Sequence, residues 1–326
     1  MKKISWGIIG CGDVTELKSG PAFNKVKNSE LIAVMRRDAA KAKDYAQRHN
    51  VPKWYTDANS LINDPDINAI YIATPPSSHE AYTIAALQAD KPVYVEKPMS
   101  VNAASAKNMM NAVASKNGKL TVAHYRRAQP LFQKIKDLIT EKVIGEIRFA
   151  KLDMYKRSFS KEELSLEKTA WRVDPALAGG GLFHDLAPHQ LDLMYHFFGV
   201  IDKASGIATN QARLYAADDM VTGNILFRSG VHFSGIWCFN VSAADEKDNC
   251  EIVGEKGKIG FSFFEQKPVL LTINDKTEKL SFDALQHVQQ PMIEQVVNYF
   301  LGEAPNPCSA EDGVEVMRLI DKFTTR

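Results

Sequence analysis

The chain has 326 residues, 45% of them hydrophobic and 24% charged, and its formal net charge at neutral pH is +1. This balance is typical of a globular protein and excludes a strongly basic chain that binds nucleic acid or an anionic membrane through its overall charge. No stretch holds the roughly 18 consecutive apolar residues of a membrane-spanning helix, and no apolar signal segment precedes the first strand pattern. We therefore expect a cytoplasmic protein of two domains.

Four cysteines are scattered along the chain without the short spacings of a metal site. In an intracellular chain of this size they are typical of reduced, mostly buried thiols. We therefore expect no bound metal.

The first residues carry the pattern of a strand that ends in a glycine-rich turn. The mostly apolar run at 4–9 is typical of a buried parallel strand, and Gly10 and Gly12 follow directly. The first glycine allows a tight turn, and the second lets the backbone approach a pyrophosphate at the start of the next helix. Thr15 fills the third small position, where Gly or Ala is usual, and a plain strand-to-loop turn is the alternative interpretation. The cofactor-binding residues expected here are Gly10, Gly12, Asp13 and Val14.

The first third of the chain alternates strand and helix patterns. Strands are predicted at 30–35, 52–55, 69–73, 92–95 and 120–123, and helices at 38–49, 77–89 and 100–116. Strand–helix units with short links predict a doubly wound parallel sheet, which supports the nucleotide-binding interpretation of the glycine turn.

The pattern changes after residue 123. A helix is predicted at 130–142, strands at 147–154, 220–227, 231–240, 250–253, 259–263, 269–273 and 279–282, and closing helices at 292–301 and 310–323. Turn residues between neighbouring strands, such as Ser229-Gly230, predict hairpins in a large open sheet. The fold class is therefore α/β, with a dinucleotide-binding domain at 1–123 and a second α/β domain, built on a mostly antiparallel open sheet, at 124–326.

Two of these strands form one predicted hairpin that is rich in large apolar residues. Ile225, Phe227, Phe233 and Trp237 are expected on an exposed face of the second sheet. An apolar sheet face left open is an association surface, so we expect a homo-oligomer, most simply a dimer, with a tetramer as the alternative.

The end of the second predicted strand bears on the choice of cofactor. An NAD-preferring domain places an acid there to accept from the ribose hydroxyls, whereas this chain has Arg36 and Arg37 before Asp38. Guanidinium groups pair with phosphate in a fork, so the two arginines favour NADP. Asp38 could still reach the ribose, which keeps NAD possible, and a solvated basic pair at a helix start is a further alternative.

Another strand ends at the carboxyl edge of the sheet, where ligands bind in such folds. Thr74, Pro75 and Pro76 form that end, and His79 follows in the first turn of the next helix. We expect all four residues beside the cofactor, although a plain strand terminator and a half-exposed helix histidine are the alternatives.

The tripeptide Glu96-Lys97-Pro98 follows a buried strand and projects into the same crevice. We expect Glu96 and Lys97 beside the cofactor. A lysine at this place can hydrogen-bond a substrate hydroxyl and favour its alkoxide form. A surface turn is the alternative.

The glycine triplet Gly179-Gly180-Gly181 lets the backbone pass close to a ligand or another segment. In a helix after the triplet, Asp185 and His189 are four residues apart on one face, and Asp192 is three further on. A histidine beside a carboxylate is a natural general acid and base near neutral pH. A core or surface histidine with a helix ion pair is the alternative, and Pro188 predicts a first turn or a kink.

These motifs together resemble the glucose–fructose oxidoreductase/inositol dehydrogenase (Gfo/Idh/MocA) family over nearly the whole chain. The resemblance rests on the glycine loop, Glu96-Lys97-Pro98, Tyr125-Arg126-Arg127, the glycine triplet and the spacing of Asp185, His189 and Asp192. It implies a Rossmann domain followed by an α/β domain whose large open sheet is often used for oligomerisation. It also implies that Trp171-Arg172 approaches the cofactor, as a similar loop does in some members. The catalytic positions implied are Lys97, Asp185 and His189, and the substrate-binding positions are these three with Tyr125 and Arg126.

The function implied is NAD(P)-dependent oxidation or reduction of a sugar, a polyol or a related alcohol, with NADP favoured. His189 would exchange the hydroxyl proton, Lys97 would stabilise the oxyanion, and Asp185 would orient the histidine or bind a neighbouring hydroxyl. Two alternatives are a glycosidase that uses bound NAD for transient oxidation and a nucleotide-binding sensor without catalysis.

Overall fold

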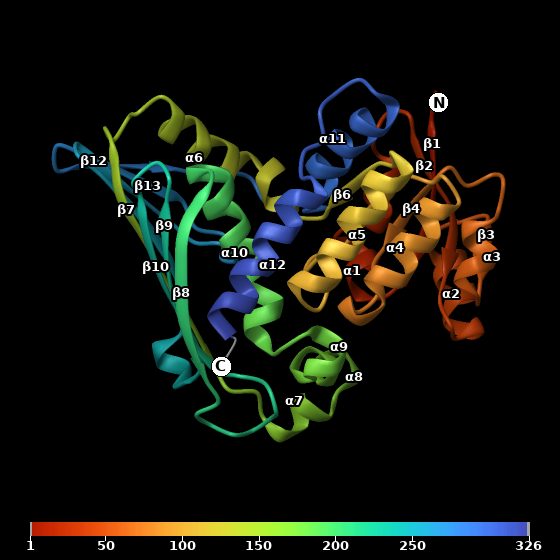
Figure 1. Ribbon diagram of the computed structural model, residues 1–326, viewed down its shortest axis with the longest axis horizontal. Coiled ribbons are helices and arrows are strands. Elements are labelled where there is room, and N and C mark those ends of the chain that lie inside the picture. The colour runs from red at the N-terminus through yellow and green to blue at the C-terminus, as the bar shows by residue number, and fades with distance from the viewer. Residues whose placement is uncertain (1, 325–326) are drawn as a thin grey trace. The chain divides into compact units, whose positions relative to one another are not determined.

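The computed structural model describes residues 2–324, which separate into two compact units (Figure 1). The first unit contains the chain up to residue 129 together with 285–317, and the second contains 130–284 together with the chain from residue 318. The domain boundary predicted from the sequence, at residue 123, places 285–317 in the second domain. In the structure this segment belongs to the first unit.

The first unit is built on a six-stranded sheet. Its strands are β1 (Ile4–Ile9), β2 (Ser29–Met35), β3 (Lys53–Tyr55), β4 (Ala69–Ile72), β5 (Val93–Val95) and β6 (Leu120–Val122). All pairs are parallel, and the spatial order is β3-β2-β1-β4-β5-β6, so the predicted doubly wound sheet is confirmed. The order reverses between β1 and β4, and open α/β sheets bind ligands at such a reversal, outside the carboxyl ends of the strands.

Helices and short 3-10 turns connect these strands. They are α1 (Asp13–Leu17), η1 (Gly20–Asn24), α2 (Ala39–Arg48), α3 (Ala58–Ile62), η2 (Pro76–Ser78), α4 (His79–Gln88), α5 (Ala103–Lys116) and η3 (Tyr125–Ala128). The C-terminal segment adds α11 (Gln290–Leu301) and the first part of α12 (Ala310–Thr324), whose residues from Arg318 group with the second unit.

Trp6 explains why the C-terminal segment joins the first unit. Its fully buried ring on β1 lies 4.8 Å from that of Phe23 and 5.6 Å from that of Phe300 on α11. Aromatic side chains bury the largest apolar areas, so the contact between Phe300 and Trp6 stabilises the packing of α11 in this unit. A buried hydrogen bond from the Tyr94 hydroxyl to the side-chain oxygen Oε1 of Gln289, at 3.1 Å, adds a polar contact.

The second unit is built on an eight-stranded sheet. Its strands are β7 (Ile147–Arg157), β8 (Ile201–Thr209), β9 (Met220–Phe227), β10 (His232–Val241), β11 (Lys247–Gly254), β12 (Gly257–Phe261), β13 (Val269–Ile273) and β14 (Lys276–Leu280). The order is β14-β13-β12-β11-β7-β10-β9-β8, and only β7 and β10 pair in parallel. The expected large, mostly antiparallel sheet is therefore confirmed, with β8 as a strand that the sequence patterns did not predict.

The helices of the second unit are mostly short. They are α6 (Pro130–Thr140), α7 (Lys161–Ser165), α8 (Glu167–Ala170), η4 (Trp171–Val173), α9 (Pro175–Ala178), α10 (Leu182–Phe198) and η5 (Ala243–Asp245). Within residues 2–324, none of the helices combines the length and the apolarity needed to cross a bilayer.

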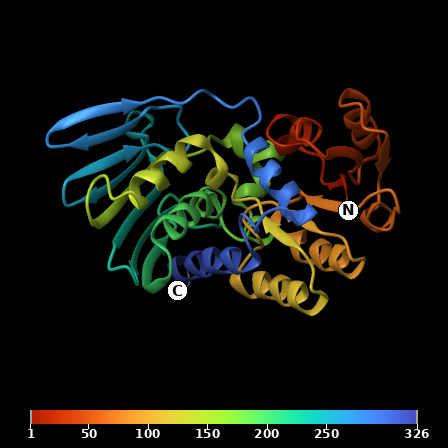
Figure 2. The same ribbon diagram turned by 90° about the horizontal axis from the view of Figure 1, so that it is seen from above.

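The longest of them, α10, covers one face of the large sheet (Figures 1 and 2). The ring of Phe183 on α10 lies 5.1 Å from that of Trp237 on β10, and Phe198 lies 5.3 Å from Phe227 on β9. Alternate residues of β9 and β10 point to this face, so the two strands contribute one continuous apolar layer to the core.

The expectation that Ile225, Phe227, Phe233 and Trp237 lie on an exposed face is wrong. All four side chains are buried, Trp237 completely. The hairpin register pairs Phe233 with Ile225 and Trp237 with Val221, so the set shares the face under α10. Large aromatic side chains gain the most from leaving water, and the exposed face of these strands carries smaller and more polar residues instead.

Candidate functional site

The glycine loop after β1 brings two strand ends into close approach. Gly10 has a φ of +96°, which L side chains rarely adopt, and its N–H donates to the Met35 carbonyl oxygen at 2.9 Å. A Cβ on Gly10 would lie 2.9 Å from the backbone nitrogen of Thr74. A Cβ on Gly12 would meet no atom within 4 Å, so the space beside this residue is open to a ligand. The loop thus fits the backbone of a dinucleotide.

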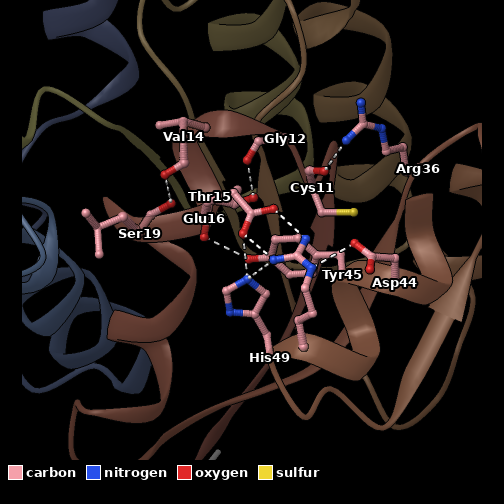
Figure 3. A network of polar contacts seen from close by, with 12 residues as sticks. Cys11, Gly12, Val14, Thr15, Glu16, Ser19, Arg36, Asp44, Tyr45 and His49 are labelled. Atoms are coloured by element: carbon pink, nitrogen blue, oxygen red, sulfur yellow. Dashed lines mark hydrogen bonds and ion pairs between the residues drawn. The ribbon is translucent and has the colours of Figure 1, made fainter.

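Thr15, the departure from the usual small residue, is buried in a hydrogen-bonded turn (Figure 3). Its hydroxyl donates to the Gly12 carbonyl oxygen at 2.7 Å, and its own carbonyl oxygen accepts from the Tyr45 hydroxyl at 2.8 Å. Burial raises the pKa of Tyr45 above its usual value, so this phenol stays a donor. The threonine satisfies its hydroxyl locally, and the loop keeps its shape without a Gly or an Ala.

Glu16, on α1 after the glycine loop, is hydrogen-bonded to the C-terminal end of α2, as Figure 3 shows. Its two oxygens each accept from Arg48 at 2.8 Å, and one also lies 2.8 Å from His49 Nε2. The hydrogen bonds from Arg48 lower the pKa of Glu16 to about 2. Because folding lowers this pKa, the pairing stabilises the fold above the ordinary pKa of a glutamate and is lost as the pH falls toward 2.

The residues expected to select the cofactor lie at the end of β2. Arg36 Nη1 donates to the Cys11 carbonyl oxygen at 3.2 Å, and Arg37 is exposed. The Asp38 carboxylate caps α2 by accepting from the Lys41 N–H at 3.1 Å. The Arg36 guanidinium therefore borders the glycine loop, while the Asp38 carboxylate is hydrogen-bonded to the start of α2.

His79 is buried and connects the turn after β4 with the turn after β5. Its Nε2 lies 2.7 Å from the Thr74 carbonyl oxygen, and its Nδ1 lies 3.1 Å from that of Pro98. Burial lowers the pKa of His79, and its carbonyl partners oppose this shift. Both ring nitrogens face backbone oxygens, so the expected direct contact of His79 with a cofactor is not supported. Pro76 is also buried, and Thr74 and Pro75 remain partly exposed.

The charged pair after β5 divides into a buried and a projecting residue. Glu96 is buried, and its Oε1 accepts from the Tyr71 hydroxyl at 2.5 Å and from the Gln289 amide at 2.6 Å. Its Oε2 accepts from the Lys97 N–H at 3.1 Å. The Lys97 side chain is partly exposed, and the Lys97–Pro98 peptide bond is cis. The expected contact of Glu96 with a cofactor is therefore not supported, while Lys97 remains a candidate for contact with substrate.

The segment after β6 holds the last candidates of the first unit. The guanidinium carbon of Arg126 lies 5.6 Å from the centre of the Tyr125 ring. Arg127 is buried and pairs with Asp312 at 3.0 Å, so it supports the fold. Burial, followed by the charge of Arg127, holds the pKa of His124 well below its usual value. His124 is therefore neutral, and Tyr125 and Arg126 remain candidates for substrate binding.

In the second unit, the glycine triplet leads into α10. Gly179 has a φ of +85° and ends α9 in the left-handed conformation. A Cβ on Gly181 would lie 2.7 Å from the Ala217 side chain, so the backbone here passes close to a neighbouring loop. The helix expected after the triplet is α10, and Pro188 lies inside it, beyond the first turn.

Asp185 and His189 lie one turn apart on α10, as their spacing predicts. Arg172 Nε lies 3.3 Å from Asp185 Oδ2, and the Arg172 guanidinium carbon lies 4.5 Å from the centre of the Trp171 ring. The ion pair restrains the carboxylate, and the stacked indole restrains the arginine. Asp192, one turn beyond His189, is buried. The Trp171-Arg172 loop, expected at the cofactor, thus contacts the candidate acid.

His189 lies against a loop that the sequence analysis did not single out. Its ring is 5.7 Å from that of Phe264, edge to face, and the residue is 4% exposed. The buried Asp248 carboxylate accepts from the successive N–H groups of residues 263–265, at 3.0, 2.6 and 3.2 Å. These three hydrogen bonds hold the loop after β12 in place, with the Phe264 ring packed against His189.

The candidate residues therefore fall into two groups, with Lys97 in the first unit and Asp185 and His189 in the second. Among residues 2–324, no group of three or more His, Cys, Asp or Glu side chains is arranged to hold a metal ion. Tyr71 and Gln289 were missed by the sequence analysis. A tyrosine inside an aliphatic buried strand is the signal that could have found the first, because its hydroxyl needs a buried partner.

Comparison with known proteins agrees with this architecture. The family model described as "Oxidoreductase family, NAD-binding Rossmann fold" matches residues 4–124, and the model described as "GFO/IDH/MocA C-terminal domain" matches residues 132–260. "Oxidoreductase P35" from Formosa agariphila is 46% identical over 321 residues, 98% of this chain and 98% of that protein. Trans-1,2-dihydrobenzene-1,2-diol dehydrogenase from Oryctolagus cuniculus is 30% identical over 255 residues, 78% of this chain and 72% of that protein. A solved structure of levoglucosan dehydrogenase in complex with NADH aligns with a TM-score of 0.89 at 21% identity, covering 98% of this chain and 96% of that chain.

Gly12→Ala should weaken cofactor binding without unfolding the protein. Gly12 has an extended backbone that alanine adopts freely, and the added methyl group enters the open space beside the loop. We expect the dissociation constant for a reduced nicotinamide dinucleotide, measured by fluorescence titration, to rise about tenfold or more. The free energy of unfolding should change by less than about 1 kcal/mol.

Gly10→Ala is the matched contrast. Its backbone conformation is strained for alanine and its Cβ would press on backbone atoms, so we expect a loss of about 1–3 kcal/mol in the free energy of unfolding. Equal stability of the two variants in denaturant titrations, or unchanged cofactor binding by Gly12→Ala, would contradict this description of the loop.

Proposed function

We propose, for a chain that belongs to the GFO/IDH/MocA family of NAD-binding oxidoreductases, that it transfers a hydride between a nicotinamide cofactor and a carbon bearing a hydroxyl or carbonyl group of a sugar, a polyol or a related compound. The observation that carries this proposal is Lys97 at the carboxyl end of β5, beside the strand-order reversal where such sheets bind ligands. Two of the similar proteins are named for a dihydrodiol and for levoglucosan, and both compounds carry hydroxyl groups, which supports this substrate class.

The bound nicotinamide supplies the hydride acceptor or donor, and this chain positions the substrate and moves one proton. In the direction of oxidation, His189 takes the hydroxyl proton as the hydride leaves, and in reduction the protonated ring returns it. The packing of Phe264 against His189 supports this role, because it restrains the imidazole in one orientation.

Lys97 stabilises the oxyanion that develops on the reacting carbon's oxygen. Asp185 orients His189 or binds a neighbouring hydroxyl, and its ion pair with Arg172 supports a fixed position for the carboxylate. Tyr125 and Arg126 complete the proposed substrate-binding set.

We further propose that NADP is preferred over NAD. Arg36 and Arg37 offer positive charge at the end of β2, where the extra phosphate of NADP is bound in such domains. The capping hydrogen bond of Asp38 supports the same preference, because this carboxylate is engaged with the start of α2.

We also propose that the chain forms a homo-oligomer through the face of the large sheet opposite α10. Ile207 is 72% exposed and Phe149 is 45% exposed on this face, which also carries a groove of about 770 Å³ over β7 to β10. A two-fold interface pairs a surface with itself, so the surface must be complementary to its own copy. Lys151 and Glu251 lie opposite each other on neighbouring strands and place charges of both signs on this face, which is compatible with such pairing.

Arg36→Glu should reverse the cofactor preference. The variant loses a charge-assisted contact to the extra phosphate and adds repulsion, so the dissociation constant for NADP should rise at least about tenfold more than that for NAD. Titration of both reduced cofactors by fluorescence provides the ratio. Equal weakening of both would mean that Arg36 contributes only through the loop carbonyl to which it is bonded.

Lys97→Met should abolish most turnover while leaving the cofactor bound. A screen of sugars, polyols and dicarbonyls against both cofactors, read by nicotinamide absorbance, first identifies a substrate. With it, kcat should fall about a hundredfold or more, because the oxyanion loses its stabilising charge, while cofactor affinity stays within about twofold. Lys107→Met, an exposed lysine on α5, is the control and should keep wild-type turnover.

His189→Asn tests the second half of the same chemistry. Turnover should fall, and one limb of the pH–rate profile near neutrality should disappear, because the titrating base has been removed. The double variant with Lys97→Met should lose less than the product of the single losses. Retained turnover in Lys97→Met would make the lysine a structural residue and would overturn the proposed mechanism.

Ile207→Glu should dissociate the proposed oligomer. A charge at a side chain this exposed leaves the folded unit intact but opposes burial against a second copy. Light scattering after size exclusion should show a smaller particle than the wild type. Trp54→Glu, at an exposed aromatic residue on β3, should leave the particle mass unchanged, and a wild-type monomer at micromolar concentration would contradict the proposal.

A further inference from the structure

A buried polar cluster lies behind the end of β5, and the proposed reaction does not use it. Its members are Glu96, Tyr71 on β4, Tyr94 on β5 and Gln289 just before α11. Both tyrosines and the glutamine have no exposed surface, and Glu96 is 5% exposed. A carboxylate removed from water this completely needs strong donors, so the geometry of the cluster is specified by hydrogen bonding.

Two side chains hold one oxygen of the carboxylate. The Tyr71 hydroxyl donates to Glu96 Oε1 at 2.5 Å, and the Gln289 amide donates to the same oxygen at 2.6 Å. The Tyr94 hydroxyl donates to Gln289 Oε1 at 3.1 Å. This bond fixes the orientation of the side-chain amide, with its NH₂ group toward Glu96. Burial, followed by the Glu96 charge, raises the pKa of Tyr71 well above its usual value, so the phenol keeps the proton that it donates.

The cluster connects Lys97 with the segment that follows the glycine loop. The second oxygen of Glu96 accepts from the Lys97 N–H at 3.1 Å. Toward the glycine loop, the Tyr71 and Ser19 hydroxyls lie 3.1 Å apart, and the backbone N–H of Gln289 donates to the Lys18 carbonyl oxygen at 3.1 Å. One buried network therefore reaches both the proposed catalytic lysine and the backbone after the cofactor loop.

We propose that Tyr71 and Gln289 are positioning residues for Lys97 and act through the Glu96 carboxylate. The inference rests on the proposed role of Lys97 in the reaction. With two short hydrogen bonds on Oε1, the carboxyl group cannot turn, and Oε2 stays directed at the Lys97 N–H. The backbone is thereby fixed where the lysine side chain leaves the sheet, and a displacement of about 1 Å at such a point can cost about a hundredfold in rate.

Tyr71→Phe removes one of the two donors to Glu96, together with the contact between the Tyr71 and Ser19 hydroxyls. Without this donor the carboxyl group can turn, so the Lys97 amide should exchange with deuterated solvent about tenfold faster or more. Pro98 has no N–H, so a peptide that ends at this residue reports the Lys97 amide without a contribution from its C-terminal neighbour. With the substrate from the screen, kcat should fall about tenfold while cofactor affinity stays within about twofold.

Tyr55→Phe is the matched control. The Tyr55 hydroxyl, on β3, also donates to a carboxylate, that of Asp64 at 2.6 Å, and it lies outside the cluster. We expect a loss of stability in denaturant titrations, because this variant also removes a hydrogen bond from a phenol to a carboxylate, but wild-type exchange at Lys97 and a loss in kcat below about threefold. Gln289→Met removes the other donor and tests the same claim if Tyr71→Phe fails to fold.

The outcomes separate this inference from the proposed function. Equal effects of Tyr71→Phe and Tyr55→Phe on Lys97 exchange and on kcat would overturn the positioning role. Unchanged exchange and turnover in Tyr71→Phe, with turnover lost in Lys97→Met, would overturn the positioning role alone. Retained turnover in Lys97→Met would instead overturn the function proposed for Lys97, whatever the exchange data show.

Discussion

Parallel strands gather their carboxyl ends at a single edge of a sheet, and the candidate residues of the first unit depend on that constraint. The glycine loop follows β1, Thr74 follows β4 and Lys97 follows β5. Because the strand order reverses between β1 and β4, the connections leave this edge on opposite sides and keep it accessible. Buried polar side chains then hold the turns in place, with His79 between the turns that follow β4 and β5 and with Glu96 beneath the second of these turns.

The local parts of this architecture could be predicted from the sequence. An apolar run followed by Gly10 and Gly12 indicated a parallel strand that ends in a tight turn, and the four-residue spacing of Asp185 and His189 indicated one face of a helix. Such inferences succeed because strand and helix periods, and the freedom of glycine, are properties of neighbouring residues. The same reasoning predicted the antiparallel hairpins of the large sheet, whose turns are marked by residues such as Gly230.

The remaining features depend on which segments meet in space. Alternation in a strand shows which residues share a face but not which face is covered, so Phe233 and Trp237 were assigned to the wrong side. The sequence around Glu96 gave no sign that this side chain is buried. The groups that donate hydrogen bonds to it lie on β4 and in the segment before α11, far from it in the chain. The ion pair between Arg172 and Asp185 likewise joins elements whose approach no local pattern encodes.

The central claim is that a hydride passes between the cofactor and a carbon of the substrate. The most direct measurement uses a reduced nicotinamide cofactor dideuterated at its C4 position, a carbonyl substrate from the screen, and mass spectrometry of the product. The proposed function predicts that one deuterium atom appears on the former carbonyl carbon and that the label does not pass to water. An unlabelled product, or no product from a protein that binds the cofactor tightly, would contradict it and would favour transient oxidation or a sensor instead.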